Sequence, residues 1–325
     1  MVANESSIFE GFSVEFYFKC VTTFLGLLFN LLIMIMILKF KNLQTIPNIF
    51  IFNLALLDFL NMIPFMLTSI AFDALSILSV EFGFCLFYYV LDVWVNFNIV
   101  YIIVTLTIDR YFAIVHCISL RQYHTKRNAR IACVLTCLMS IGISIPMLLE
   151  VDVYEYDGTN YCIFNKNLEL YRFILNYLIP LVIMIICYVF IIKVMVSSQQ
   201  IDRNNTTRKH SKRVFILALT IVIAYVILFT PYFIYDLLVY FDRQFYEQAF
   251  HSISVWMQYS HSVINPILYT FIGKNFKKDL LKTFQCLDAA PCRPDFQVQS
   301  RFASRSSNRL TLTTSNPSLE VRSKM

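Results

Sequence analysis

Charged residues and glycine are both scarce in this sequence. Only 15% of the 325 residues are charged and six are glycine, whereas 58% are hydrophobic. A soluble domain carries about 25% charged residues, so this chain has too few to cover a water-exposed surface. The low glycine content excludes a collagen-like chain, and nine cysteines are too few for a disulfide scaffold. The high apolar content excludes disorder over most of the chain.

Seven apolar runs are present between the charged segments. They lie at about 20–38, 48–72, 84–112, 130–149, 170–192, 214–238 and 247–271. Each is long enough for a helix across the hydrocarbon core, which takes about 20 residues. Lipid offers backbone polar groups no partner, so each run is predicted to be a helix. We therefore expect an all-α membrane protein, with a seven-helix bundle in residues 20–272 after an N-terminal segment, 1–19.

The distribution of lysine and arginine predicts the orientation of the bundle. Basic residues gather in the segments near 39–47, 121–130, 193–213 and 274–285. The alternate segments carry only Lys19, Lys166, Arg172 and Arg243. Because basic loops stay in the cytoplasm, we expect a multi-pass plasma-membrane protein with an extracellular N-terminus. The basic inner face also suits anionic membrane lipids and is not read as a nucleic-acid site.

The sequence after the seventh run predicts two further segments. Residues 273–286 place apolar side chains at helical spacing with lysines opposite, which predicts a short amphipathic eighth helix along the inner leaflet. Cys286 at its end is a candidate for palmitoylation. Residues 287–325 are polar and rich in Ser, Thr and Arg, so we expect a disordered cytoplasmic tail with candidate phosphorylation sites.

Two cysteines and one sequon fall on the predicted outer side. Cys85 and Cys162 are the cysteines that clearly face the oxidising compartment, and we predict that they are bridged. The bridge would hold the loop at 150–169 across the mouth of the bundle; two free thiols are the alternative. Asn4 begins an acceptor sequon and is a candidate for glycosylation.

Charged residues inside the spans indicate function, because charge in a membrane is costly. Asp92 and Arg110 are eighteen residues apart in the third run, about five helical turns and about 27 Å, so they share a face. Asp92 lies about 10 Å inward of Cys85, at the depth of a pocket floor. There its carboxylate is suited to pair with a ligand ammonium or guanidinium. The alternative is an internally hydrogen-bonded aspartate, with Tyr259 as its partner.

A second polar group is expected deeper in the bundle. Asp58 and Asn30 lie mid-span in the second and first runs, and Ser262 and Asn265 share a face of the seventh. Together these side chains are suited to hold water or a small cation. A hydrogen-bonded packing network is the alternative.

Several motifs in these spans are found together, in one order, in a known family. The motif residues are Asn30, the run Asn53 to Asp58, Cys85, Asp109-Arg110-Tyr111, Pro146, Pro180 with Tyr188, Pro231, and the run Asn265 to Tyr269. They resemble the signatures of rhodopsin-like (class A) G-protein-coupled receptors, one set per span across roughly residues 20–286. The resemblance implies a receptor that activates a heterotrimeric G protein, with arrestin and receptor kinases as partners of the tail.

The resemblance also implies roles for individual residues. Arg110 would pair with Asp109 at rest and meet the G protein in the active state, when Tyr188 and Tyr269 would join it. Pro231 would be the hinge of the sixth helix. The implied switch residues are Asp109, Arg110, Tyr111, Tyr188, Asn265, Pro266 and Tyr269.

Two departures from the family pattern bear on the implied sodium site and on the sixth helix. The resemblance implies an allosteric sodium site at Asp58, Ser262 and Asn265, and no other cofactor. The polar third-helix residue that often completes this site is Ile99 here, which counts against sodium binding. Phe229 stands where the family usually has tryptophan, so an aromatic switch would lack the indole N–H.

The ligand class follows from the outer half of the spans. The seventh run has no lysine for a retinal Schiff base, which excludes an opsin. Asp92, Tyr259 and the run Ser262 to Tyr269 are similar to those of the somatostatin, opioid and allatostatin-C group of peptide receptors, so we expect an extracellular cationic neuropeptide. The candidate pocket residues are Asp92, Asn96, Tyr232, Phe233, Asp236, Gln258 and Tyr259.

Other functions remain as alternatives. A biogenic amine or another small chemosensory ligand would also use Asp92. A transporter is a remote alternative, because internal repeats are missing and glycine is too scarce for broken helices. The sequence shows no metal cluster, nucleophile triad or phosphate loop, so an enzyme is not expected.

Overall fold

The computed structural model describes residues 14–68, 82–120, 122–156, 159–164, 168–197, 206–242 and 247–272. All of them belong to one compact unit of the chain. Asn4, the amphipathic segment 273–286 with Cys286, and the tail lie outside the described residues, so the predictions made for them stand as predictions.

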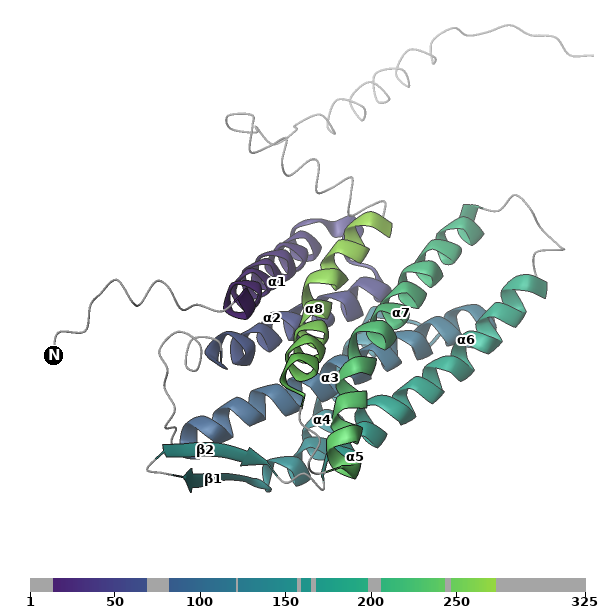
Figure 1. Cartoon of the computed structure of the whole chain (residues 1–325). Coiled ribbons are helices and arrows are strands. Elements are labelled where there is room, and N and C mark those ends of the chain that lie inside the picture. Colours follow the sequence, from purple (N-terminus) through teal and green to yellow (C-terminus); the bar gives the residue numbers. More distant parts are fainter. Residues whose placement is uncertain are drawn as a thin grey trace, which may run out of the picture. The chain divides into compact units, whose positions relative to one another are not determined.

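Where the seven predicted runs fall within the described residues, they lie on helices. The helices are α1 (Val14–Lys39), α2 (Ile46–Thr68), α3 (Phe82–Val115), α4 (Lys126–Leu148), α5 (Leu168–Phe173), α6 (Ile179–Ser197), α7 (Thr206–Phe241) and α8 (Gln248–Ile272), with a 3₁₀ turn at Lys41–Leu43 and a π turn at Ile174–Leu178 (Figure 1). The residues flanking the π turn are helical, so α5, the turn and α6 form one continuous helix. The fifth run therefore corresponds to this composite helix.

Among the described residues, six helices are long and apolar enough to cross a membrane. The seventh, α8, has 25 residues but a more polar sequence. Its polar side chains are buried: Ser254, Gln258, His261, Ser262 and Asn265 are each at most 6% exposed. They face other helices instead of lipid, so the polarity of α8 reflects its inward face.

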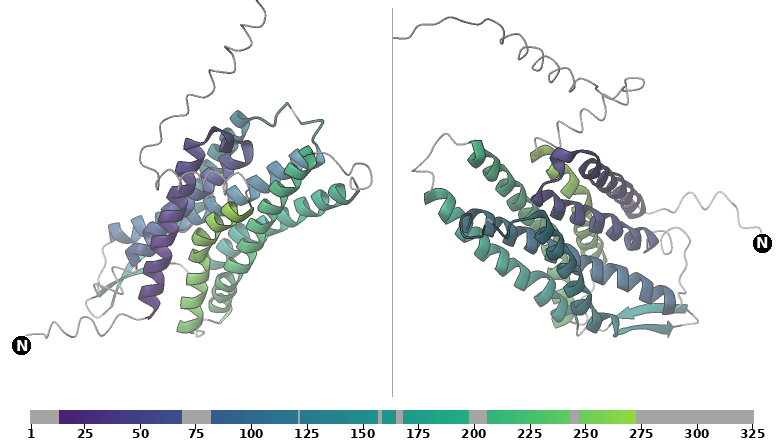
Figure 2. Two further views of the ribbon diagram at one scale, coloured as in Figure 1. Left: turned by 90° about the horizontal axis from the view of Figure 1, so that it is seen from above. Right: turned by 180° about the vertical axis from the view of Figure 1, so that it is seen from behind.

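Helix α3 is the central element of the bundle. Its most apolar stretch is 72% buried, compared with 22% for the composite helix Leu168–Ser197. It contacts α2, α4, α6 and α7 (Figure 2). The composite helix instead presents apolar side chains such as Val182, Ile185 and Val189 on its exposed surface, as expected for a lipid-facing helix. Asp92 and Arg110 therefore lie on the most enclosed helix.

The loop after α4, at the end of the bundle that the charge pattern predicts to be the outer end, contains a two-stranded antiparallel sheet that the sequence did not predict. Strands β1 (Val151–Tyr156) and β2 (Thr159–Phe164) pair with Val153 opposite Cys162. Figure 2 places this hairpin at the end of the bundle where α3 begins. Cys85 is buried against Val151 and is disulfide-bonded. The side chain of Cys162 lies outside the described residues, so the Cys85–Cys162 pairing remains a prediction.

The π turn lies beside Pro180, and both disturb the backbone hydrogen bonds of the composite helix. Proline has no N–H, so the carbonyl of Asn176 loses its helical donor. The Tyr225 hydroxyl on α7 donates to that carbonyl at 2.7 Å. In the same turn, the Tyr101 hydroxyl on α3 donates to the Leu175 carbonyl at 3.0 Å. Neighbouring helices thus satisfy groups that lipid would leave without partners.

Candidate functional site

Asp92 on α3 is held by two side chains at the outer end of the bundle. Its Oδ1 atom accepts a 2.6 Å hydrogen bond from the Tyr259 hydroxyl on α8 and a 3.0 Å bond from Asn96 Nδ2. The Tyr259 ring stacks on Phe65 of α2, with 4.2 Å between ring centroids. In this conformation Asp92 is the internally bonded aspartate that the sequence left as an alternative, and its carboxylate is fixed at the helix interface.

A small cavity adjoins Asp92. It is lined by Asp92, Val93, Asn96, Phe97, Arg172, Asn176, Tyr232, Phe233 and Gln258. The cavity has a volume of about 10 Å³, which holds one water at most. Five of the seven predicted pocket residues line this cavity. The other two bind lining residues: Tyr259 binds Asp92, and Asp236 binds Arg172. A larger ligand therefore requires these side chains to move.

Arg172 on α5 is the cavity-lining residue that Asp236 binds, and it was not among the predicted pocket residues. Its Nη2 atom lies 2.5 Å from Asp236 Oδ2 on α7 and 2.8 Å from Glu169 Oε2. The guanidinium also lies over the Tyr232 ring, 4.9 Å from the centroid. Among the described residues that line the cavity or bind its walls, three carboxylates accompany this one cation. Carboxyl groups thus outnumber cations at this site, which favours a cationic ligand.

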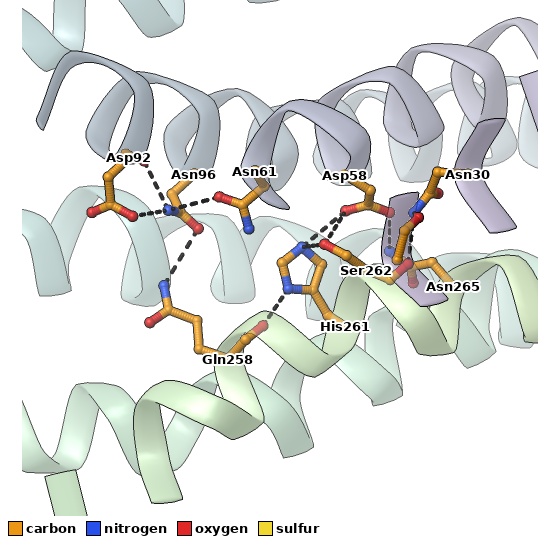
Figure 3. Close-up of polar contacts among 10 residues, drawn as sticks. Asn30, Asp58, Asn61, Asp92, Asn96, Gln258, His261, Ser262 and Asn265 are labelled. Carbon is orange, nitrogen blue, oxygen red and sulfur yellow. Dashed lines mark hydrogen bonds and ion pairs between the residues drawn. The ribbon is translucent and has the colours of Figure 1, made fainter. Parts of the chain in front are cut away.

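A buried polar track runs inward from Asp92 (Figure 3). The Asn96 amide lies 3.4 Å from Asn61 Oδ1 on α2, and Gln258 Nε2 on α8 donates to Asn96 Oδ1 at 3.3 Å. The backbone carbonyl of Gln258 contacts His261 Nδ1 one turn further in. His261 Nε2 then lies 2.9 Å from Asp58 Oδ1. Hydrogen-bonded groups therefore connect the outer carboxylate with the deep one.

Asp58 is fully buried, and both of its oxygens have partners. Ser262 Oγ donates to Oδ1 at 3.2 Å, and Asn265 Nδ2 donates to Oδ2 at 2.9 Å. The sequence grouped these three residues, and the structure brings them together. Asn30 is adjacent but binds the backbone carbonyl of Ser262 instead of the carboxylate.

His261 is the member of this group that the sequence reading missed. Two signals were available in the sequence: it is an ionisable residue inside a membrane span, and it directly precedes Ser262. Its ring also packs against Phe229 on α7, with 4.9 Å between centroids. His261 therefore touches both the deep carboxylate and the aromatic residue next to the Pro231 hinge position.

Arg110 and Asp109 form an ion pair at the inner end of α3. His124 also reaches Asp109, with 3.1 Å between Nε2 and Oδ1. Tyr188 packs on Phe215 of α7 at 5.7 Å between centroids. The buried hydroxyl of Tyr269 has no hydrogen-bond partner within the described ranges. The two tyrosines expected to join Arg110 are therefore buried, and neither hydroxyl is bonded to Arg110 in this conformation.

A cavity of about 740 Å³ opens beside this inner ion pair. Phe50, Asp109, Phe112, Cys117, His124 and Asn128 are among the residues that line it. Tyr111 lies outside this lining and packs edge-on against Phe190 of α6. The inner end of α3 thus has an accessible space next to the switch residues, in contrast to the nearly filled cavity at the outer end.

Within the described residues, seven helices of membrane length, with α5 and α6 counted as one, enclose a buried polar track from Asp92 to Asp58. The ion pair of Arg110 lies at the other end of α3. This is the arrangement of a membrane receptor bundle. Residues 29–269 match the family model described as "7 transmembrane receptor (rhodopsin family)". The chain belongs to this family: it is a G-protein-coupled receptor, a multi-pass plasma-membrane protein and not an enzyme.

Individual relatives agree with this assignment. Somatostatin receptor type 2 from Mus musculus is 29% identical over 271 residues, which cover 78% of this chain and 72% of the receptor. Somatostatin receptor type 2 from Sus scrofa is 29% identical over 276 residues, which cover 79% of this chain and 73% of the receptor.

Proposed function

We propose that this receptor binds a cationic peptide from the extracellular side and activates a heterotrimeric G protein. The observation that carries the proposal is the partly buried Asp92 carboxylate, which lies between α3 and α8 beside the Arg172 cluster, where carboxyl groups outnumber cations. The somatostatin receptor relatives support a peptide as the ligand. A ligand ammonium or guanidinium would replace the Tyr259 and Asn96 contacts of Asp92 with a charge-assisted pair.

The mechanism is a population shift between two states of the bundle. A ligand that displaces the Tyr259 hydroxyl and the Asn96 amide would disturb the first links of the polar track. The track passes through His261 to Asp58, and the His261 ring contacts Phe229 on α7. The disturbance would therefore reach the helix that carries the Pro231 hinge. Movement of α7 would uncover Arg110, whose side chain is buried in this conformation, so that it could leave Asp109 and meet the G protein, with Tyr188 and Tyr269 as new partners. The unbonded hydroxyl of Tyr269 supports this rearrangement, because a buried hydroxyl gains from a partner.

The remaining assignments follow from the orientation. We infer an extracellular N-terminus with glycosylation at Asn4, an outer disulfide between Cys85 and Cys162, and palmitoylation at Cys286. Arrestin and receptor kinases would engage the hydroxyl-rich tail, and anionic lipids the basic inner segments.

A biogenic amine is the second candidate, because it would also pair with Asp92. Small hydroxyl side chains on the fifth helix usually accompany such a ligand. The residues of that helix which line the cavity are Arg172 and Asn176. A large basic ligand fits this charged wall better than a small amine does.

A ligand screen tests the proposal. Amidated and cyclic neuropeptides, and in parallel a panel of amines, are applied to cells that express the full chain, with nucleotide exchange on G proteins as the readout. We expect a basic peptide to stimulate exchange, and Arg110→Ala to abolish the response at equal surface expression. A response to amines alone would favour the second candidate. Substrate uptake without nucleotide exchange would contradict the receptor function.

A further inference from the structure

The deep polar group does not fit the sodium ion that the family resemblance implies. A hard cation requires several oxygen ligands. Both Asp58 oxygens are already engaged, by His261, Ser262 and Asn265. Ile99, which stands at the family's polar third-helix position, is a fully buried hydrocarbon. Among the described side chains of this group, Asn30 Oδ1 is the oxygen without a hydrogen-bond partner. One free amide oxygen is too few for a hard cation, and a basic ring lies directly against the one carboxylate of the group.

The hydrogen-bond partners of His261 determine the charge of the pair. Nδ1 contacts the carbonyl oxygen of Gln258, and Nε2 lies 2.9 Å from Asp58 Oδ1. A carbonyl oxygen only accepts, so Nδ1 carries a proton. A second proton lies between Nε2 and Oδ1, on one atom or the other. The pair is imidazolium with carboxylate, or neutral imidazole with carboxylic acid, and its total charge is zero in both cases.

Zero net charge removes the electrostatic reason for a bound cation. An uncompensated carboxylate is costly at this depth, where Asp58 is 0% and His261 2% exposed. The histidine supplies the compensation from within the chain. Because it is covalently attached to α8, it is present at any salt concentration.

We propose that His261 occupies the place of the sodium ion in this receptor, so that sodium neither binds at Asp58 nor regulates the bundle. The tethered ring replaces the ion as the centre of the deep polar group. The His261 ring also packs against Phe229 and contacts the Gln258 carbonyl. A bare ion has no ring that could pack against Phe229. The coupling between the outer pocket and the inner face is then independent of sodium. This inference requires only the deep polar group and stands whether or not the ligand is a peptide.

The thermal stability of the purified full-length receptor, without ligand, tests this proposal. The unfolding temperature is measured as choline chloride is replaced by sodium chloride at constant ionic strength, with ²³Na relaxation as a direct measure of binding. We expect the wild-type receptor and the exposed-histidine control His116→Asn to show no saturable response to sodium. A saturable sodium response of the wild-type receptor that Asp58→Asn abolishes would overturn the proposal. This comparison needs no substitution at His261.

A double variant tests whether His261 is what prevents sodium from binding at Asp58. His261→Asn with Ile99→Ser removes the ring and adds side-chain oxygens on both sides of Asp58. We expect sodium to raise its unfolding temperature by about 2–4 °C with saturation. Adding Asp58→Asn should remove that rise. A folded double variant that stays insensitive to sodium would show that His261 is not what excludes the ion, and the proposal would be wrong.

Discussion

Asn30 on α1 donates a 2.7 Å hydrogen bond to the backbone carbonyl of Ser262 on α8, and this is the carbonyl that Pro266 leaves without a helical donor. Asn30 Nδ2 also lies 2.8 Å from the carbonyl of Gly26 in its own helix. Asn30 and Ser262 are both fully buried. One side chain therefore joins two helices and satisfies a backbone group that water cannot reach.

Asn30→Ala should lower the stability of the receptor. The Ser262 carbonyl would be left buried without a donor, at a cost of about 1–3 kcal/mol, or about 2–8 °C in unfolding temperature. Asn53→Ala is the matched control, because Asn53 Nδ2 donates to the Ile49 carbonyl, which keeps its helical N–H partner. Thermal unfolding of the purified variants makes the comparison. Equal losses for the two variants would contradict the role given to Asn30.

Asp92→Asn should weaken a cationic agonist found in the screen. The substitution keeps the shape of the side chain and removes the charge that pairs with the ligand, so potency should fall by about 30-fold or more. Asp152→Asn on β1 is the control, because Asp152 is exposed and its carboxylate accepts from the backbone N–H of Val153. Radioligand competition at equal surface expression measures both. Unchanged affinity of the Asp92 variant would remove the central observation behind the peptide proposal.

The ion pair between Arg172 and Asp236 should couple the outer ends of α5 and α7. Arg172→Gln and Asp236→Asn should each lower the unfolding temperature, because each leaves a mostly buried charge without its main partner. The double variant should lose less than the sum, with a coupling energy of about 1–3 kcal/mol. Arg172→Gln combined with Asp152→Asn is the control pair and should be additive. An additive result for Arg172 and Asp236 would show that their contact does not stabilise the bundle.

Changes at the inner ion pair should separate ligand binding from signalling. Arg110→Ala should abolish agonist-stimulated nucleotide exchange while agonist binding is retained. Asp109→Asn should raise basal exchange, because Arg110 loses the carboxylate that holds it. Arg130→Ala on α4 removes an exposed arginine near the same membrane face and should change neither quantity. Normal exchange by the Arg110 variant would exclude this arginine as the switch.

Much of the site was predictable because its residues are polar or charged within apolar runs, and their spacing along one helix shows which of them share a face. Asp92 and Arg110 are charged residues inside an apolar run, and their spacing alone places them on one helix face. Ser262 and Asn265 share a face of the seventh run for the same reason. A hydrogen bond between Asp92 and Tyr259 was one of the two predicted alternatives. The sequence pattern does not show how the two helices are placed relative to each other, so it does not distinguish a hydrogen-bonded carboxylate from one that lines an open pocket.

Other contacts were not predicted, because they leave no pattern along a single helix. The ion pair of Arg172 with Asp236 depends on how α5 and α7 are rotated toward each other. The sequence placed Arg172 only among the few basic residues of the outer segments. The segment that forms the β1–β2 hairpin was predicted only as a loop, because short strands outside the membrane lack a long periodic pattern.

The sequence by itself determined the seven spans, the expected orientation and the family motifs. Span length is set by bilayer thickness and charge placement by the cost of burial, and both act on consecutive residues. Only the tertiary structure decided that His261 compensates Asp58 and that Asn30 satisfies the Ser262 carbonyl. Those contacts join residues from different helices. The relative depth and rotation of the helices are set by side-chain packing across the bundle, and the periodicity of a single helix does not predict them.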